Sequence, residues 1–166
     1  MENVEFTIVR EDGKTYGKHY TNRQGEINLE YKLPAGTYLI RETNTLKGYA
    51  LDTNVRKVAL DWGDDQLIEW ENYPLASIRI EKTDAETGDP ISGVKFELFD
   101  KNKESIGTYI TDSKGEIHLD KMFLGDATYY IEETENEGYV VTKGLQTVKT
   151  KWGKTTYVEL ENKPIQ

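Results

Sequence analysis

The sequence predicts an all-β protein built from two tandem β-sandwich domains. Composition is the first reason, because the 166 residues include 11 tyrosines together with frequent valine, isoleucine and threonine, which strands favour. The second reason is that short segments alternate apolar and polar residues, while helical periodicity is absent. The third is an internal repeat, which indicates that one structural unit occurs twice along the chain.

The repeat has an offset of 90 residues, at which Val4-Glu5-Phe6 corresponds to Val94-Lys95-Phe96. Other matched positions are Gly25 and Gly115, Gly48 and Gly138, Trp62 and Trp152, Asn72 and Asn162, and, at an offset of 91, Glu42 and Glu133. The change of offset falls in expected loops, where length changes are tolerated. We therefore expect one domain at residues 1–75 and a second at residues 76–166.

Within the second repeat, the expected strands cover residues 77–82, 94–99, 128–133 and 158–161. Residues 77–82 and 94–99 alternate apolar and polar side chains, which is the two-residue period of a strand. Residues 87–90 and 112–115 have turn chemistry, and Gly115 is free to adopt a positive φ. About seven strands in roughly 90 residues are typical of a two-sheet sandwich.

The two repeats are unequal at their beginnings. Residues 76–92 precede Val94, whereas only Met1–Asn3 precede Val4, so the first repeat lacks its first strand. Three explanations stay open: a chain boundary that cuts the strand off, a lysine-bearing strand from another chain that adds to the open edge and bonds to Asn72, or a domain that does without this strand.

Charge and composition exclude several classes of function. The chain has 21 basic and 30 acidic residues and a net charge of −9, so phosphates of nucleic acid and anionic membrane surfaces would repel it. No apolar run approaches the ~20 residues of a membrane span. Cysteine is absent, which excludes disulfide and thiolate chemistry. No set of nucleophile, base and oxyanion donors indicates an enzyme with turnover.

No metal or cofactor site is predicted either. Acidic residues gather near the end of the first repeat, at Asp52, Asp61, Asp64 and Asp65, but without the spacing of a calcium loop. His19 and His118 are not spaced as a metal-binding pair. We expect these residues to be solvated loop and strand-surface groups.

The order of motifs in the second repeat carries a resemblance to a known family. These motifs are Ile80–Asp84, Thr87-Gly88, Gly93–Phe96, Tyr130–Thr134, Gly138-Tyr139 and Glu161–Pro164. Their order resembles the B-type repeat of the collagen adhesin Cna and the prealbumin-like domains of SpaA-type pilins, over all of the second repeat and most of the first. The resemblance implies reversed immunoglobulin-like sandwiches that serve as stalk or spacer repeats in secreted adhesins or pilins of the Gram-positive cell wall.

The same resemblance implies an autocatalytic isopeptide cross-link. In that family a lysine on the first strand joins an asparagine on the last strand with the help of a middle-strand acid, which maps onto Lys82, Asn162 and Glu133. The first repeat keeps Glu42 and Asn72 but has no lysine at the matching position. We therefore expect a cross-link in the second repeat, and a vestigial or trans-acting pair in the first.

Strand alternation supports this assignment independently. Lys82 shares a strand face with Ile78 and Ile80, so it points into the core if they do, and a buried lysine needs a partner. Burial lowers the pKa of a lysine and frees its amine for attack. A neutral Glu133 would bond to the carbonyl of Asn162 and carry a proton to the departing ammonia.

Partners follow from the same interpretation. The expected neighbours are adjacent repeats of the parent protein. The competing function is a ligand-binding adhesin module that contacts a host matrix protein or a glycan, since a fold alone does not exclude binding. The short connections and nearly equal repeat lengths favour the spacer.

Overall fold

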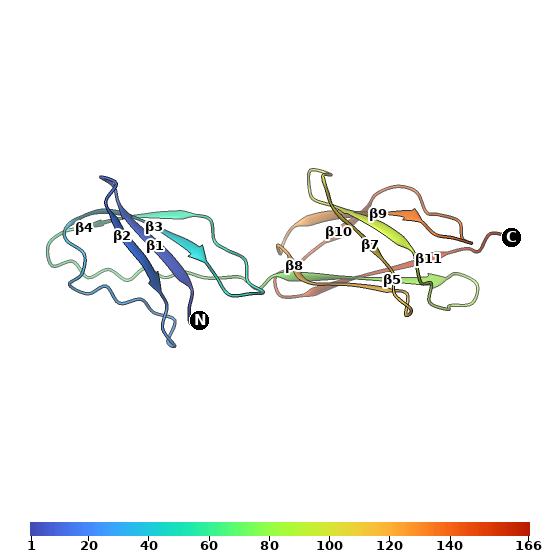
Figure 1. Ribbon diagram of the computed structural model, residues 1–166, viewed down its shortest axis with the longest axis horizontal. Coiled ribbons are helices and arrows are strands. Elements are labelled where there is room, and N and C mark those ends of the chain that lie inside the picture. The colour runs from blue at the N-terminus through green and yellow to red at the C-terminus, as the bar shows by residue number, and fades with distance from the viewer. The chain divides into compact units, whose positions relative to one another are not determined.

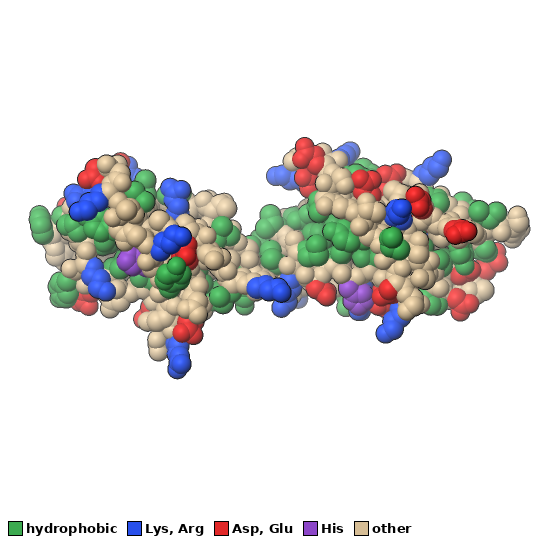
Figure 2. All heavy atoms as spheres, viewed as in Figure 1, with side chains coloured by type: hydrophobic (Ala, Val, Ile, Leu, Met, Phe, Trp, Pro, Cys, Tyr) green, Lys and Arg blue, Asp and Glu red, His purple; other side chains and the backbone are tan.

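The computed structural model describes residues 1–166, and every regular element in it is a strand. The structure contains no helix that could span a membrane. The chain divides into two units, Met1–Asn72 and Tyr73–Gln166. The all-β prediction is confirmed. Acidic and basic side chains are interspersed over the visible face of each unit (Figure 2).

The second unit is a sandwich of two sheets (Figure 1). The strands of the first sheet are, in spatial order, β10 (Gln146–Lys149), β9 (Thr128–Glu135), β6 (Lys95–Phe99) and β7 (Ser105–Ile110). Those of the second sheet are β11 (Thr155–Asn162), β5 (Ala76–Asp84) and β8 (Glu116–Phe123). The first and last strands of the unit, β5 and β11, are therefore parallel neighbours, while β8 pairs antiparallel with the other side of β5.

The core of the second unit follows from strand alternation. Ile78 and Ile80 of β5 and Phe96 and Leu98 of β6 point between the sheets, where each is at most 1% exposed. Ile131 of β9 lies in the same cluster. Burial of each such side chain is worth about 1.5–3 kcal/mol, so this register, which keeps all five inside, is strongly preferred over a one-residue slip.

The first unit forms a single four-stranded sheet. Its strands are, in spatial order, β2 (Thr15–Tyr20), β1 (Glu5–Arg10), β3 (Gly36–Asn44) and β4 (Val55–Leu60). Residues 26–33 and 65–72 correspond by the repeat to β8 and β11, yet neither segment is a strand. In the second unit both of those strands pair with β5, and the first unit has no counterpart of β5. Its second sheet is therefore not formed.

Candidate cross-link site

Lys82, Glu133 and Asn162 meet inside the second unit, although they come from three different strands, β5, β9 and β11. Lys82 Nζ donates to Glu133 Oε2 at 3.1 Å, and Asn162 Nδ2 donates to Glu133 Oε1 at 2.5 Å. Lys82 Nζ also contacts Oδ1 of Asn162. One carboxylate thus bridges the amine and the amide.

The three side chains are almost completely shielded from water, with exposures of 1% for Lys82, 5% for Glu133 and 2% for Asn162. Lys82 is inside because it follows Ile78 and Ile80 on the core face of β5. Its ammonium lies 5.9 Å from the ring centroid of Phe96. Burial lowers the pKa of Lys82, and the contact with Glu133 opposes that shift only in part.

Alternation also decides which glutamate of β9 enters the site. Ile131 and Glu133 are both buried. Glu132 lies between them, points to the opposite face of the sheet and is only half-buried. Its backbone partner in the register of β9 with β6 is Glu97. The carboxylate that lies next to Lys82 is therefore the one predicted by the match to Glu42.

The backbone after Gly138 orients the amide of Asn162. The carbonyl oxygen of Val140 accepts a second hydrogen bond from Asn162 Nδ2, at 2.8 Å, and Val140 N–H donates to the Lys163 carbonyl at 2.9 Å. With its nitrogen held by two acceptors, the amide turns Oδ1 toward Lys82. Sequence reasoning missed Val140 because a backbone carbonyl leaves no signature in the residue type.

A second contact at this end of the unit was also missed. The Tyr139 hydroxyl donates to Asp84 Oδ2 at 2.9 Å, while Asp84 Oδ1 accepts backbone N–H bonds from Glu86 and Thr87. These bonds hold the pKa of Asp84 below its ordinary value. They tie the end of β5 to the segment that carries Val140. The Gly-Tyr pair that occurs in both repeats was the feature of the sequence that could have indicated this contact.

The first unit contains the same arrangement without the lysine. Asn72 Nδ2 donates to Glu42 Oε1 at 2.7 Å and to Oε2 at 2.9 Å, and it also donates to the carbonyl oxygen of Ala50 at 3.2 Å. Glu42 is 3% exposed. Burial raises the pKa of Glu42, although hydrogen bonds from the Asn72 side chain and the Asp52 N–H act in the opposite direction.

This pKa shift predicts a pH dependence of the first unit. Because the folded-state pKa of Glu42 lies above its ordinary value of 4.5, its contribution to stability is fully present below that value and is lost as the pH rises through the raised pKa. Urea unfolding at a series of pH values, followed by NMR signals from β1 and β3, should show this loss. Glu42→Gln should remove it, and an identical pH profile in both proteins would contradict the assignment.

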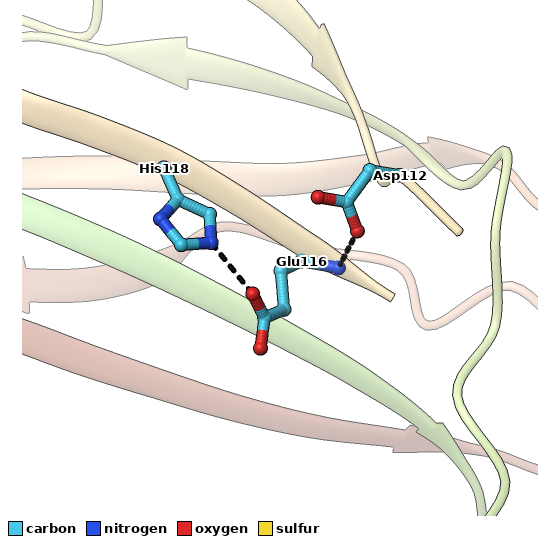
Figure 3. A group of neighbouring side chains, drawn as sticks. All are labelled: Asp112, Glu116 and His118. Carbon is cyan, nitrogen blue, oxygen red and sulfur yellow. Dashed lines mark hydrogen bonds and ion pairs between the residues drawn. The ribbon is translucent and has the colours of Figure 1, made fainter. Parts of the chain in front are cut away.

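One further cluster brings together groups of the kind that bind metals. Ligand atoms of Asp112, Glu116 and His118 lie within 4.8 Å of one another (Figure 3). The Asp112 carboxylate already caps the turn by accepting the N–H groups of Lys114 and Glu116. The Arg79 guanidinium, 3.0 Å from His118 Nδ1 and 3.9 Å from Glu116, opposes a cation there.

The remaining candidates from the sequence, which are His19 and the aspartates near the end of the first repeat, belong to the first unit and not to this cluster. His19 and His118 belong to different units. Asp52 Oδ1 accepts the N–H of Asn54, and Asp64 Oδ2 accepts that of Asp61, which are local turn contacts.

Comparison with known proteins assigns both parts of the chain to one family of domains. Residues 1–74 and 76–164 each match the model of the SpaA family, described as a prealbumin-like fold domain. The chain is 28% identical over 169 aligned residues to serine-aspartate repeat-containing protein F of Staphylococcus epidermidis, an alignment that covers 86% of this chain. It covers 10% of that relative's length, so the chain spans about a tenth of the curated protein it matches.

Two solved structures share the fold. The shaft pilin SpaA from Lactobacillus rhamnosus GG aligns with 100% of this chain and 89% of its own, with a TM-score of 0.53 and 16% identity. A streptococcal ancillary pilin aligns with 99% of this chain and 58% of its own, with a TM-score of 0.51 and 22% identity.

Proposed function

This chain belongs to the SpaA family of prealbumin-like fold domains, and on that premise we propose that it is a load-bearing stalk segment of a secreted adhesin or pilin at the bacterial cell wall. Its partners are then the adjacent repeats of the same parent protein. The single observation that supports this role best is the buried group of Lys82, Glu133 and Asn162, which joins the first strand of the second unit to its last.

The chemistry proposed for this group is an intramolecular isopeptide bond. The neutral amine of Lys82 attacks Cγ of Asn162, a bond forms between Nζ and Cγ, and the bond between Cγ and Nδ2 breaks. Glu133 accepts the proton that Nζ loses and passes it to Nδ2, which leaves as ammonia. One lysine and one amide are consumed per molecule, so the step is autocatalytic maturation rather than turnover.

Each requirement of this step has a physical counterpart in the site. Burial lowers the pKa of Lys82, which favours the neutral amine that attack requires. Glu133 contacts both the nitrogen that loses a proton and the nitrogen that gains one, at 3.1 and 2.5 Å, as a proton carrier must. The parallel pairing of β5 with β11 supplies the proximity.

Intact-mass spectrometry tests the proposal directly. The purified chain is expected to be lighter than its sequence mass by one ammonia, and digestion should yield a branched peptide that joins Lys82 to Asn162. Glu133→Gln retains a hydrogen-bond acceptor for Asn162 but cannot carry the proton, so this variant should have its full mass. If the unsubstituted chain is folded and has its full sequence mass, the cross-link is refuted.

A further inference from the structure

We propose that Tyr139 is a positioning residue for the cross-linking step, and that it acts through its hydrogen bond to Asp84. This contact fixes the segment 138–140, and the carbonyl oxygen of Val140 in that segment holds the amide of Asn162. The inference rests on the function proposed above, and it adds a residue outside the group of three side chains that react. It assigns to Tyr139 an effect on the rate of the step rather than on its final extent.

Three segments of the second unit meet beside the reacting side chains. The end of β5 carries Lys82, the end of β11 carries Asn162, and the segment 138–140 follows β9 and supplies the carbonyl that accepts from the amide. The first two segments are joined directly, because the N–H of Ala85, just after β5, donates to the backbone carbonyl of Asn162 at 2.9 Å. The mutual placement of the three segments therefore decides how the amide faces the amine.

Backbone hydrogen bonds join the segment 138–140 to the chain just after β11. Two of these bonds flank Tyr139 and are each 2.9 Å long, Val140 N–H to the Lys163 carbonyl and Ile165 N–H to the Gly138 carbonyl. Such bonds use only main-chain groups, which every residue except proline offers in full. This connection therefore does not depend on the side chain at position 139.

The connection from the segment 138–140 to β5 is made by side chains. The Tyr139 hydroxyl donates to Asp84 Oδ2 at 2.9 Å. Asp84 is a fixed acceptor, because it is 8% exposed and its Oδ1 accepts the N–H groups of Glu86 and Thr87 at 2.8 and 3.1 Å. Of the bonds that join the three segments to one another, this is the one that the residue types decide.

The placement of the segment 138–140 matters because the amide of Asn162 can react in one orientation only. Its nitrogen is held by the Val140 carbonyl at 2.8 Å and by Glu133 at 2.5 Å, which turns Oδ1 toward Lys82. A shift of the carbonyl by about 1 Å would take this contact beyond hydrogen-bonding distance. The amide could then rotate and present its N–H groups to the amine, and a misplacement of this size can slow a reaction roughly 100-fold.

The contact between Tyr139 and Asp84 keeps its donor and its acceptor over a wide pH range. The hydrogen bond to Asp84 raises the pKa of Tyr139 above its ordinary value of 10.0, and the backbone N–H groups of Glu86 and Thr87 lower the pKa of Asp84 below 3.8. Neither group therefore titrates between these values. Loss of the contact should lower the rate of cross-linking by one factor throughout this range and leave the shape of the pH–rate profile unchanged.

The rate is measured as the whole chain refolds. The chain is recovered unfolded in urea with its full sequence mass, diluted into buffer, and followed by intact-mass spectrometry for the loss of ammonia. Tyr139→Phe keeps a ring packed against the core but removes the donor, and it should lose ammonia roughly 10–100-fold more slowly. Tyr129→Phe is the matched control, because it removes a hydroxyl that accepts the Leu124 N–H elsewhere in the same core, and it should react at the rate of the unsubstituted chain.

Variants of Asp84 separate positioning from a general effect on stability. Asp84→Ala removes the acceptor and should slow the step, and the addition of Tyr139→Phe should slow it no further, because both changes remove the same contact. Asp84→Asn places an amide N–H against the hydroxyl oxygen, which then accepts the bond, so this variant should recover most of the rate. Urea unfolding of each variant in a Glu133→Gln background, which does not cross-link, should show similar losses of stability for Tyr139→Phe and Tyr129→Phe.

Several outcomes would overturn the positioning role alone. These are a rate in Tyr139→Phe equal to that of the unsubstituted chain, equal slowing by Tyr129→Phe, a pH–rate profile of altered shape, or a rate in Asp84→Asn as low as in Asp84→Ala. The last result would show that the charge of Asp84 matters rather than its contact with the hydroxyl. If the unsubstituted chain folds and never loses ammonia, the proposed cross-link itself fails, and the positioning role fails with it.

Discussion

Removal of the Lys82–Asn162 cross-link is expected to lower the free energy of unfolding of the second unit by roughly 4–5 kcal/mol. The bond would close a loop whose ends are 80 residues apart, and by analogy with disulfides a loop of that length restricts the unfolded chain by this amount. The double variant Lys82→Met/Glu133→Gln is the appropriate change. It removes both charges together and avoids the penalty of an unpaired buried charge.

Urea unfolding monitored by NMR signals from β6 and β9 measures this difference. Glu132→Gln is the matched control, because it alters the neighbouring residue on the opposite face of β9, and it should retain both the ammonia loss and the parental stability. An unfolding free energy within about 1 kcal/mol of the parent in the double variant would contradict a covalent link. Such a result would leave only a buried ion pair, which is weak evidence for stability.

Much of the site could be anticipated because it depends on local alternation. The two-residue period of β5 and β9 decides that Lys82 and Glu133 face inward and that Glu132 does not. The internal repeat then relates each residue to its counterpart. The role of the Val140 carbonyl could not be predicted, since it depends on the path of the chain beside β11.

The first unit shows where local patterns are insufficient. Residues 1–72 contain no segment that corresponds to β5, which the sequence already indicates, and the all-β class is confirmed. The absence of a second sheet is a non-local effect. Residues 26–33 and 65–72 have side chains that match those of β8 and β11 in the repeat, but no central strand lies between them to pair with both. A strand needs a partner for its backbone groups, and propensity alone does not supply one.

The second large effect is expected under mechanical force. When the second unit is pulled from its two ends, force enters at the start of β5 and leaves at the end of β11. Because these strands are parallel neighbours over eight residue pairs, from Ser77–Thr155 to Asp84–Asn162, the load shears their ladder along its whole length. A bond between Lys82 and Asn162 would carry the load past the rest of the sandwich, so the residues between them should not extend.

Single-molecule force spectroscopy of the whole chain should therefore show no unfolding step from the second unit. Lys82→Arg keeps a positive charge beside Glu133, but a guanidinium stays protonated and is no nucleophile. In this variant a new step of roughly 270 Å should appear, since the 80 residues from Lys82 to Asn162 span about 3.3–3.6 Å each when extended. The same step in the unsubstituted chain would show that Lys82 and Asn162 are not covalently joined. Its absence from both proteins would show that the ladder alone withstands the load, and that the cross-link is not what makes this segment resistant to force.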